Sequence, residues 1–110
     1  GTVRTGSNSA KITGPGYQDF LLAVSTVSTT VSIYGRYDSV YAGTLPKLMV
    51  LNGTDIGVSD ATDTMVAAAN TWEQLTLTFT PTAAGFLTIR LQSESTAPLG
   101  EAFFDDFDVA

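Results

Sequence analysis

The sequence predicts an all-β protein, an antiparallel β-sandwich or jelly roll of about seven or eight strands. Three observations support this class. Short runs of alternating apolar and polar residues recur along the chain, which is the pattern of half-buried strands. Serine and threonine supply 9 and 17 positions, and valine is frequent among the apolar residues. Clusters of glycine, proline, asparagine and aspartate separate the runs at short intervals, as turns do.

The first third of the chain contains three of the expected strands. Ser9–Thr13 alternates and stops at the glycine–proline–glycine sequence of residues 14–16, where we expect a turn. Gln18–Ser25 carries apolar residues at both parities, so a strand there could be buried on both faces. Thr30–Tyr37 has the clearest alternation in the chain.

The middle of the chain is more irregular. A turn or loop leads into a strand over Leu45–Leu51, and Pro46 favours an edge position or a strand start. Residues 52–63 are polar and rich in glycine and aspartate, so we expect a loop with one short strand around Ile56–Val58. Met65–Ala69 is the only hint of a helix, and it is too short to be stable alone.

The last third predicts three further strands. Trp72–Pro81 alternates strictly, with leucine and phenylalanine on one face and glutamine and threonine on the other. Phe86–Ser93 follows a turn and shows the same pattern, with Arg90 and Gln92 on its polar face. Residues 93–100 are expected to form a loop before a last strand over Glu101–Val109.

Length, composition and charge exclude several classes of protein. A chain of 110 residues predicts one domain, residues 1–110, with an adequate core. The absence of cysteine and histidine excludes disulfides, imidazole-based triads and zinc or iron–sulfur sites with those ligands. A net charge of −6 argues against nucleic acid or an anionic membrane as partner. No apolar stretch approaches the ~18 residues of a membrane-spanning helix, so membrane insertion is not expected.

Several segments together resemble a known family. They are Ser9–Ile12, Val31–Tyr37 followed after a loop by Leu45–Leu48, the Trp-Glu-Gln-Leu of residues 72–75 continuing through Phe79–Pro81, Gly85–Leu91, and the Phe-Phe-Asp-Asp of residues 103–106. These sequence motifs resemble those of the carbohydrate-binding modules appended to xylanases and cellulases. Similar modules occur in tail, fibre and surface proteins of phages. The resemblance implies a galactose-binding-like jelly roll.

The chain departs from the family in one respect. Members usually begin with an extra strand, and no such strand is evident in this sequence before Ser9. Either that strand is supplied by a neighbour or by further sequence, or the chain is a trimmed variant of the family. An edge strand left without its neighbour is a surface that a partner can fill.

Polar and aromatic residues of two strands suggest a glycan site. Tyr34, Arg36, Arg90 and Gln92 form the outward sets of their strands, and Tyr41 follows in a loop. In a glycan-binding role Tyr34 stacks on a sugar ring, the arginines and Gln92 donate to hydroxyls, and Tyr41 caps the site. The alternative is an ordinary solvent-facing sheet surface with aromatic–arginine contacts.

Trp72 is the only tryptophan of the chain. Its parity points it away from the apolar face of its strand, so an exposed ring is available to stack on a sugar. The resemblance implies a different role, in which this tryptophan closes the edge of the core. Both roles remain expectations at this point.

Asp105 is the one candidate metal ligand. Parity places it on the face of Phe103, Phe107 and Val109, where a carboxylate needs a partner. The resemblance implies a structural Ca²⁺ held by an aspartate near this place, together with backbone carbonyls and residues near the N-terminus. The alternatives are a carboxylate satisfied by backbone N–H groups or one turned outward by a β-bulge. No other cofactor is required.

The chain carries little that supports catalysis. Its three glutamates are Glu73, Glu94 and Glu101, and their positions do not predict a pair of carboxylates in a cleft. Phosphate-binding glycine loops and nucleophile motifs are absent from the sequence. We therefore expect a protein that is not an enzyme.

Two functions fit these observations. The first is a non-catalytic adhesion module that binds glycan on an open sheet face or loop edge. The second is a virion structural, decoration or fibre domain that packs through apolar strands against other subunits, including copies of itself. Low charge content (15%) and positive mean hydropathy (+0.18) favour the second. Both functions predict an extracellular, cell-surface or virion location.

Overall fold

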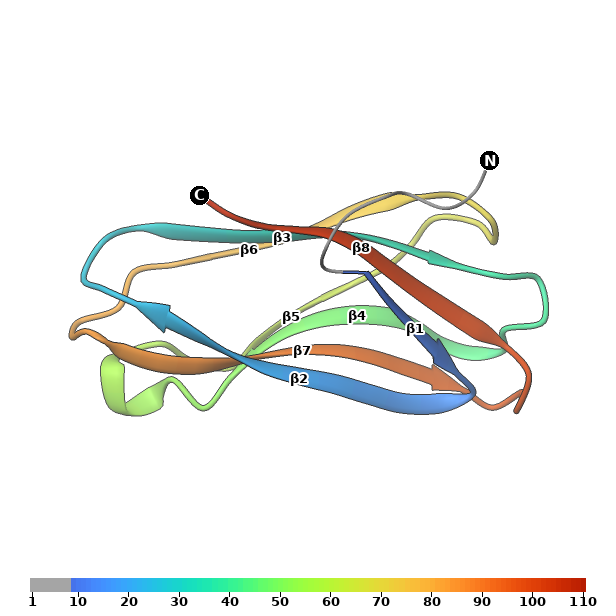
Figure 1. Ribbon diagram of the computed structural model, residues 1–110, viewed down its shortest axis with the longest axis horizontal. Helices are drawn as coiled ribbons and strands as arrows, with labels where there is room; N and C mark the ends of the chain where they lie inside the picture. The colour runs from blue at the N-terminus through green and yellow to red at the C-terminus, as the bar shows by residue number, and fades with distance from the viewer. Residues whose placement is uncertain (1–8) are drawn as a thin grey trace.

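Eight strands pair into two four-stranded antiparallel sheets in the computed structural model, which describes residues 9–110 (Figure 1). The first sheet has the order β1-β8-β3-β6 and the second the order β2-β7-β4-β5. The strands are β1 (Ala10–Thr13), β2 (Pro15–Val24), β3 (Thr29–Tyr37), β4 (Gly43–Leu51), β5 (Ala61–Thr64), β6 (Glu73–Phe79), β7 (Gly85–Ser95) and β8 (Glu101–Val109). The predicted β-sandwich of the jelly-roll class is confirmed.

The core fills the space between the sheets. Most of it comes from alternate strand residues, as the two-residue period predicts, and Met65 adds a side chain from the segment after β5. Its largest fully buried apolar side chains are those of Phe104, Ile33, Leu48, Met65, Leu75, Leu87 and Ile89. Two outer faces are left, one on each sheet.

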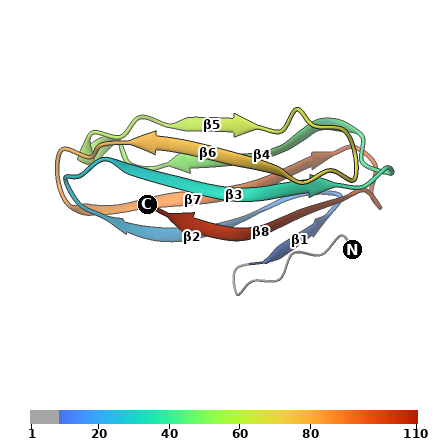
Figure 2. The same cartoon turned by 90° about the horizontal axis from the view of Figure 1, so that it is seen from above.

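A one-residue corner leads from β1 of the first sheet to β2 of the second. Gly14 lies between β1 and β2 with φ +69°, and its N–H donates to the Gly100 carbonyl at 2.7 Å. A Cβ at this position would lie 3.0 Å from the Pro98 carbonyl oxygen, so both the backbone angle and the space favour glycine. This corner makes β1 and β2 the strands of one long side of the sandwich. Figure 2 shows β5 and β6 on the opposite long side.

The expectation that β2 is buried on both faces is wrong. Phe20, Leu22 and Val24 face the core and are half-buried, whereas Leu21 is 70% exposed and Ala23 is exposed. The strand also begins at Pro15, earlier than the expected Gln18, so the expected turn at residues 14–16 is confined to Gly14. Within residues 9–110 no further layer covers the outer side of β2.

Pro46 does not mark an edge or a strand start. It lies inside β4, which has β7 on one side and β5 on the other. The register of β4 against β7 shifts between Thr44 and Lys47, so the proline falls at a bulge. A bulge tolerates proline because the ladder is interrupted there.

The segment after β4 also differs from expectation. A short 3₁₀ helix, η1 (Thr54–Ile56), replaces the strand expected around Ile56–Val58, and the short strand of this region is β5 instead. Ile56 and Val58 are both buried. Residues 65–69 form no helix. Met65 there is buried and its N–H donates to the Pro46 carbonyl at 2.9 Å.

A bulge in β8 breaks the parity of the last strand. Asp106 has φ +58°, and the register of β3 against β8 shifts between Ser32 and Tyr34. Phe107 therefore turns inward and packs edge-to-face on Phe20, with 4.9 Å between ring centroids. The expectation that Asp105 and Phe107 share a face is wrong for this reason.

Two further expectations concern the family's first strand and membrane insertion. The predicted absence of the family's first strand concerns sequence before Ser9 and lies outside the described residues. Of membrane spans, residues 9–110 contain no helix with the length and apolar character to cross a bilayer.

Candidate functional site

The outer face of the second sheet gathers most of the polar and aromatic side chains that could bind a ligand. Register places Tyr17 of β2 opposite Gln92 of β7, Gln92 opposite Lys47 of β4, and Lys47 opposite Thr64 of β5. Residues opposite one another in antiparallel strands have side chains on the same face of the sheet. One row across all four strands therefore presents a phenol, an amide, an ammonium and a hydroxyl. Tyr17 is 58% exposed.

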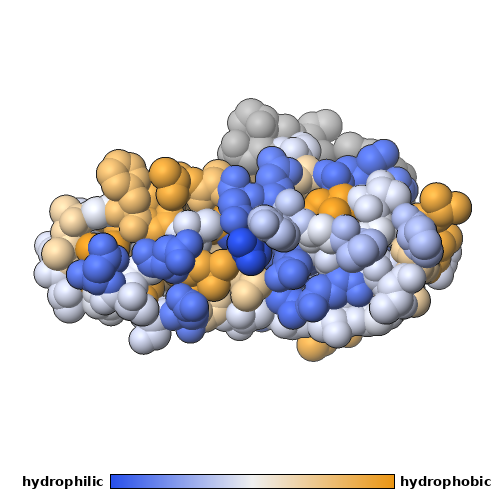
Figure 3. Space-filling model, turned by 90° about the horizontal axis from the view of Figure 1, so that it is seen from below, coloured by the Kyte–Doolittle hydropathy of each residue, from blue (hydrophilic) through white to orange (hydrophobic). Residues whose placement is uncertain are grey.

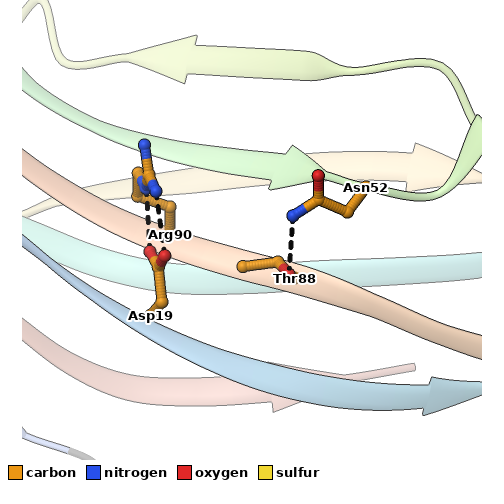
Figure 4. A network of polar contacts seen from close by, with 4 residues as sticks. All are labelled: Asp19, Asn52, Thr88 and Arg90. Atoms are coloured by element: carbon orange, nitrogen blue, oxygen red, sulfur yellow. Dashed lines mark hydrogen bonds and ion pairs between the residues drawn. The ribbon is translucent and has the colours of Figure 1, made fainter.

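Arg90 organises the aromatic end of this row. It lies opposite Asp19 in the neighbouring row, and its Nε and Nη2 donate to the two Asp19 carboxylate oxygens at 2.8 and 2.9 Å (Figure 4). Its Cζ lies 3.9 Å from the centroid of the Tyr17 ring. The fork geometry fixes the guanidinium plane, and the guanidinium in turn holds one face of the Tyr17 ring. The rest of that ring is available to a ligand.

The ion pair also shifts the acidity of Asp19. Hydrogen bonds from Arg90 hold the pKa of the Asp19 carboxyl below its ordinary value, against a smaller opposing effect of burial. Asp19 is consequently ionised at neutral pH and keeps Arg90 in place. The arginine is thereby committed to Asp19 and Tyr17.

A pH dependence of stability follows from this lowered pKa. The ion pair stabilises the fold above the unfolded-state pKa of about 3.9 and stops doing so as pH falls through the lower folded-state pKa. We expect Asp19→Asn to lower the urea midpoint at pH 7 and to leave it unchanged at about pH 2. The control is Asp55→Asn, which removes one exposed carboxylate from η1. An Asp19→Asn effect of equal size at both pH values would contradict this assignment.

Lys47 is held by Glu94. The two side chains form an ion pair across β4 and β7. Tyr41 supports the strand carrying Glu94, because its hydroxyl accepts from the Glu94 N–H at 2.8 Å and donates to the Thr44 carbonyl at 2.6 Å. These contacts position Lys47 beside Gln92.

An open depression of about 600 Å³ adjoins Tyr17 and Gln92. It extends along the start of β2 and the end of β7. Its lining consists of Pro15, Gly16, Tyr17, Gln92, Ser93, Glu94, Ser95, Thr96 and Pro98. Backbone, hydroxyl and amide groups next to one exposed ring are what a small polar ligand with one apolar face requires.

The opposite end of the same face is apolar. Leu21, Ala23 and Phe86 gather there, with Leu21 70% and Phe86 62% exposed. In Figure 3, which views this face, hydrophobic side chains are most numerous toward one end, and others lie at the far end and between polar side chains. Between the two regions, Asn52 Nδ2 donates to the Thr88 hydroxyl at 3.1 Å (Figure 4). We call Leu21, Ala23 and Phe86 the apolar end.

The six residues predicted to bind glycan do not share one surface. Arg90 and Gln92 lie on the outer face of the second sheet, whereas Tyr34 and Arg36 lie on the outer face of the first. Tyr41 is buried in the loop between β3 and β4, where its ring packs on Tyr37 at 5.3 Å.

Arg36 and Trp72 are both largely enclosed. Arg36 is only 8% exposed, donates to Asn70 Oδ1 at 2.8 Å and lies over the Phe103 ring at 5.4 Å. Trp72 directly precedes β6, the edge strand of the first sheet, and is half-buried. Within residues 9–110, no single aromatic side chain of the first sheet is as exposed as Tyr17.

Asp105 is 1% exposed on the outer side of the first sheet. Its Oδ1 accepts from the Ser9 hydroxyl at 3.0 Å and from the Asp106 N–H at 2.8 Å, and its Oδ2 accepts no hydrogen bond from residues 9–110. Ca²⁺ takes six to eight oxygens. Within residues 9–110 no group of three or more acidic side chains surrounds this carboxylate, and the ligands expected near the N-terminus lie outside the described residues. The Ca²⁺ site stays a prediction.

Sequence reasoning missed Tyr17, Asp19 and Lys47. Tyr17 follows Gly14-Pro15-Gly16, a sequence that indicates a turn, so the sequence alone does not place Tyr17 in a strand. Its parity with Asp19 and Leu21 was the available signal, because all three alternate with the core-facing Phe20 and Leu22.

Comparisons with known proteins identify the fold. The sequence matches no protein-family model and no curated protein. The structure is similar to a family 16 carbohydrate-binding module, with a TM-score of 0.67 and 16% identity over 99% of this chain and 80% of that one. It is also similar to the EclA C-terminal domain, described as a sugar-binding protein, with a TM-score of 0.60 and 13% identity over 98% of this chain and 81% of that one.

A third similar structure is larger. It is the N-terminal part of endo-1,4-β-D-xylanase 10B of Clostridium thermocellum, a CBM22-1 and GH10 pair complexed with xylohexaose. The match has a TM-score of 0.51 and 20% identity, and it covers 77% of this chain and 16% of that one. The resemblance to carbohydrate-binding modules inferred from sequence is confirmed as a likeness of fold. A fold alone does not assign a ligand.

Proposed function

We propose that the chain is a non-catalytic glycan-binding module whose ligand lies on the outer face of the second sheet, across Tyr17, Gln92 and Lys47. One observation carries the proposal: the exposed Tyr17 ring is held in place by Arg90 at the margin of an open depression. Sugars are bound by stacking their apolar face on an aromatic ring while amides and hydroxyls bond their hydroxyl groups. A ring that is already fixed loses little freedom on binding.

Gln92 and Lys47 supply the polar contacts in this proposal. Gln92 lies between Tyr17 and Lys47 in one row, so a sugar stacked on Tyr17 has the amide directly beside it. The Lys47 ammonium keeps further donor hydrogens beyond its ion pair with Glu94. Pro15 and Pro98 at the margin of the depression add apolar contact.

The charges of this face favour an uncharged ligand. Asp19 is paired with Arg90 and Glu94 with Lys47, so neither cation is left over for a uronate or sulfate. The net charge of −6 on the whole chain adds repulsion toward polyanions. We therefore propose a neutral polysaccharide.

A role without catalysis is supported by the state of the glutamates. Glu73 accepts from the N–H groups of Val66 and Ala67, both at 2.8 Å. Glu94 is paired with Lys47, and Glu101 with Lys11 at 3.4 Å. Each glutamate thus holds structure in place. The similar structures named as carbohydrate-binding modules agree with this reading. We propose that the chain acts secreted or displayed at a surface.

The second function, contact with other subunits, is supported by the apolar end of the same face. Exposed leucine and phenylalanine on one sheet surface are typical of interfaces. This contact is compatible with glycan binding, because Tyr17 and the apolar end lie at different ends of the face. A virion role stays a prediction.

Affinity electrophoresis tests the glycan proposal directly. The chain is run in gels containing xylan, glucomannan, mixed-linkage β-glucan, galactan or the anionic pectin. We expect retardation by at least one neutral polysaccharide, unchanged by 0.5 M NaCl because no ionic contact is required. Retardation by pectin alone, or by none of the five, would contradict the proposal.

A further inference from the structure

The edge of β2 is unlike the other three sheet edges of residues 9–110. Edge strands expose unpaired N–H and C=O groups, and proteins usually protect them by shortness, charge, proline or a bulge. β1 and β5 have four residues each, and β1 carries Lys11. β6 has its Thr76 N–H bonded to the Asp63 carboxylate at 2.9 Å.

β2 has none of these protections over its second half. It is ten residues long and pairs with β7 in an unbroken register from Pro15 to Val24. Its proline is the first residue, and its only charged residue, Asp19, is bound to Arg90. The five residues Phe20–Val24 are all apolar.

The core is also incompletely closed beside this segment. β1 pairs with β8 only as far as Phe104. Within residues 9–110, the rest of β8 is paired with β3 on one side and with no strand on the other. Phe20 reaches across to Phe107 of β8, yet Phe20, Leu22 and Phe107 are only half-buried. A strand added beside β2 would cover them.

We propose that β2 pairs with β2 of a second copy of this chain, antiparallel about a two-fold axis, so that two four-stranded sheets become one of eight strands. Centring the axis at Leu22 sets Phe20 opposite Val24 and Leu21 opposite Ala23 of the second copy. Apolar side chains then meet apolar side chains on both faces of the joint.

Charge favours a second copy at this edge despite the net charge of −6. In the register centred at Leu22, Asp19 faces Ser25 of the second copy. The two Asp19 carboxylates are then about six residues, or ~20 Å, apart along the strands. That separation is about two Debye lengths at physiological salt, so their repulsion is screened. The like charges of the chain therefore stay away from the joint.

The small area of the proposed β2–β2 interface predicts a weak dimer. A stable interface buries about 800 Å² per partner, which is about one seventh of the 5581 Å² surface of this chain. A joint of five or six residues buries less than that. We therefore expect a monomer at low micromolar concentration and a dimer at several hundred micromolar.

Sedimentation velocity of the 110-residue chain from about 5 µM to 1 mM tests the pairing. Leu21→Lys is the edge variant, because the side chain is 70% exposed and a lysine there guards an edge. Phe86→Lys is the matched control: it adds the same charge on the same face from β7, an inner strand. Equal thermal midpoints confirm that both variants fold.

We expect the parent chain and Phe86→Lys to dimerise and Leu21→Lys to weaken the dimer at least tenfold. Lysine reduces the magnitude of the net charge, so general repulsion cannot explain that loss. We also expect amide-hydrogen exchange of residues 20–24 to slow at high concentration in the parent and in Phe86→Lys, but not in Leu21→Lys. A chain that is monomeric throughout, or a dimer weakened equally by both variants, would overturn the proposal.

Discussion

Tyr17→Ala should weaken glycan binding at least tenfold, about 1.4 kcal/mol, while the fold survives. The ring is the one exposed aromatic side chain on the polar part of the second sheet, and its removal takes away the stacking surface. The side chain makes no core contact, so the thermal midpoint should move by little. Affinity electrophoresis against the best neutral polysaccharide measures the loss.

Tyr34→Ala is the matched control for this variant. Tyr34 is likewise a strand tyrosine, but it is half-buried on the outer face of the first sheet. We expect Tyr34→Ala to retain the parent affinity. The site assignment is wrong if Tyr34→Ala loses binding and Tyr17→Ala keeps it.

A second and larger effect is expected in the core. Phe104→Ala should lower the free energy of unfolding by about 3–5 kcal/mol, because Phe104 is 1% exposed and a cavity remains when its ring is removed. That is a large share of the roughly 5–15 kcal/mol that stabilises a domain. Urea unfolding at pH 7 measures the change, and the variant could be partly unfolded at 37 °C.

Phe103→Ala is the adjacent control. Phe103 points to the outer side of the first sheet and is half-buried. The Arg36 Cζ lies 5.4 Å from the centroid of its ring. Its loss should cost about 1 kcal/mol. Equal losses of unfolding free energy for Phe103→Ala and Phe104→Ala would contradict the structure, in which the two side chains point to opposite faces of β8.

The strands that alternate strictly could be predicted from sequence. The sequence predicts β3, β6 and β7 with their inward and outward residues, because each strand carries apolar residues on its inner face and polar residues on most of its outer face. β8 could be found but not its parity. A bulge at Asp106 reverses the side of Phe107, and nothing in the local sequence distinguishes that residue from a regular strand position.

The candidate site was only half predictable. Arg90 and Gln92 were recognised, but Tyr34 and Arg36 were joined to them because each lies on the polar face of its strand. Strand neighbours are set by long-range pairing, and alternation along one strand carries no information about which sheet it enters. β7 pairs with β2 and β4, whereas β3 pairs with β6 and β8.

The partner of Arg90 shows the same limit. Asp19 and Arg90 are 71 positions apart in sequence and become neighbours through the register of β2 against β7. Without that register the arginine counts as a free donor for sugar hydroxyls. With it, the arginine is bound to Asp19, and its part is to hold the Tyr17 ring.

The most direct test of the central claim is a titration of the ¹⁵N-labelled chain, followed by amide chemical shifts. The ligand is an oligosaccharide of the neutral polysaccharide that retards the chain most. The account predicts that the largest shifts fall on β2, β7 and β4 around Tyr17, Gln92 and Lys47. Largest shifts on β3 and β6, around Tyr34 and Gln74, would contradict it and move the glycan to the first sheet.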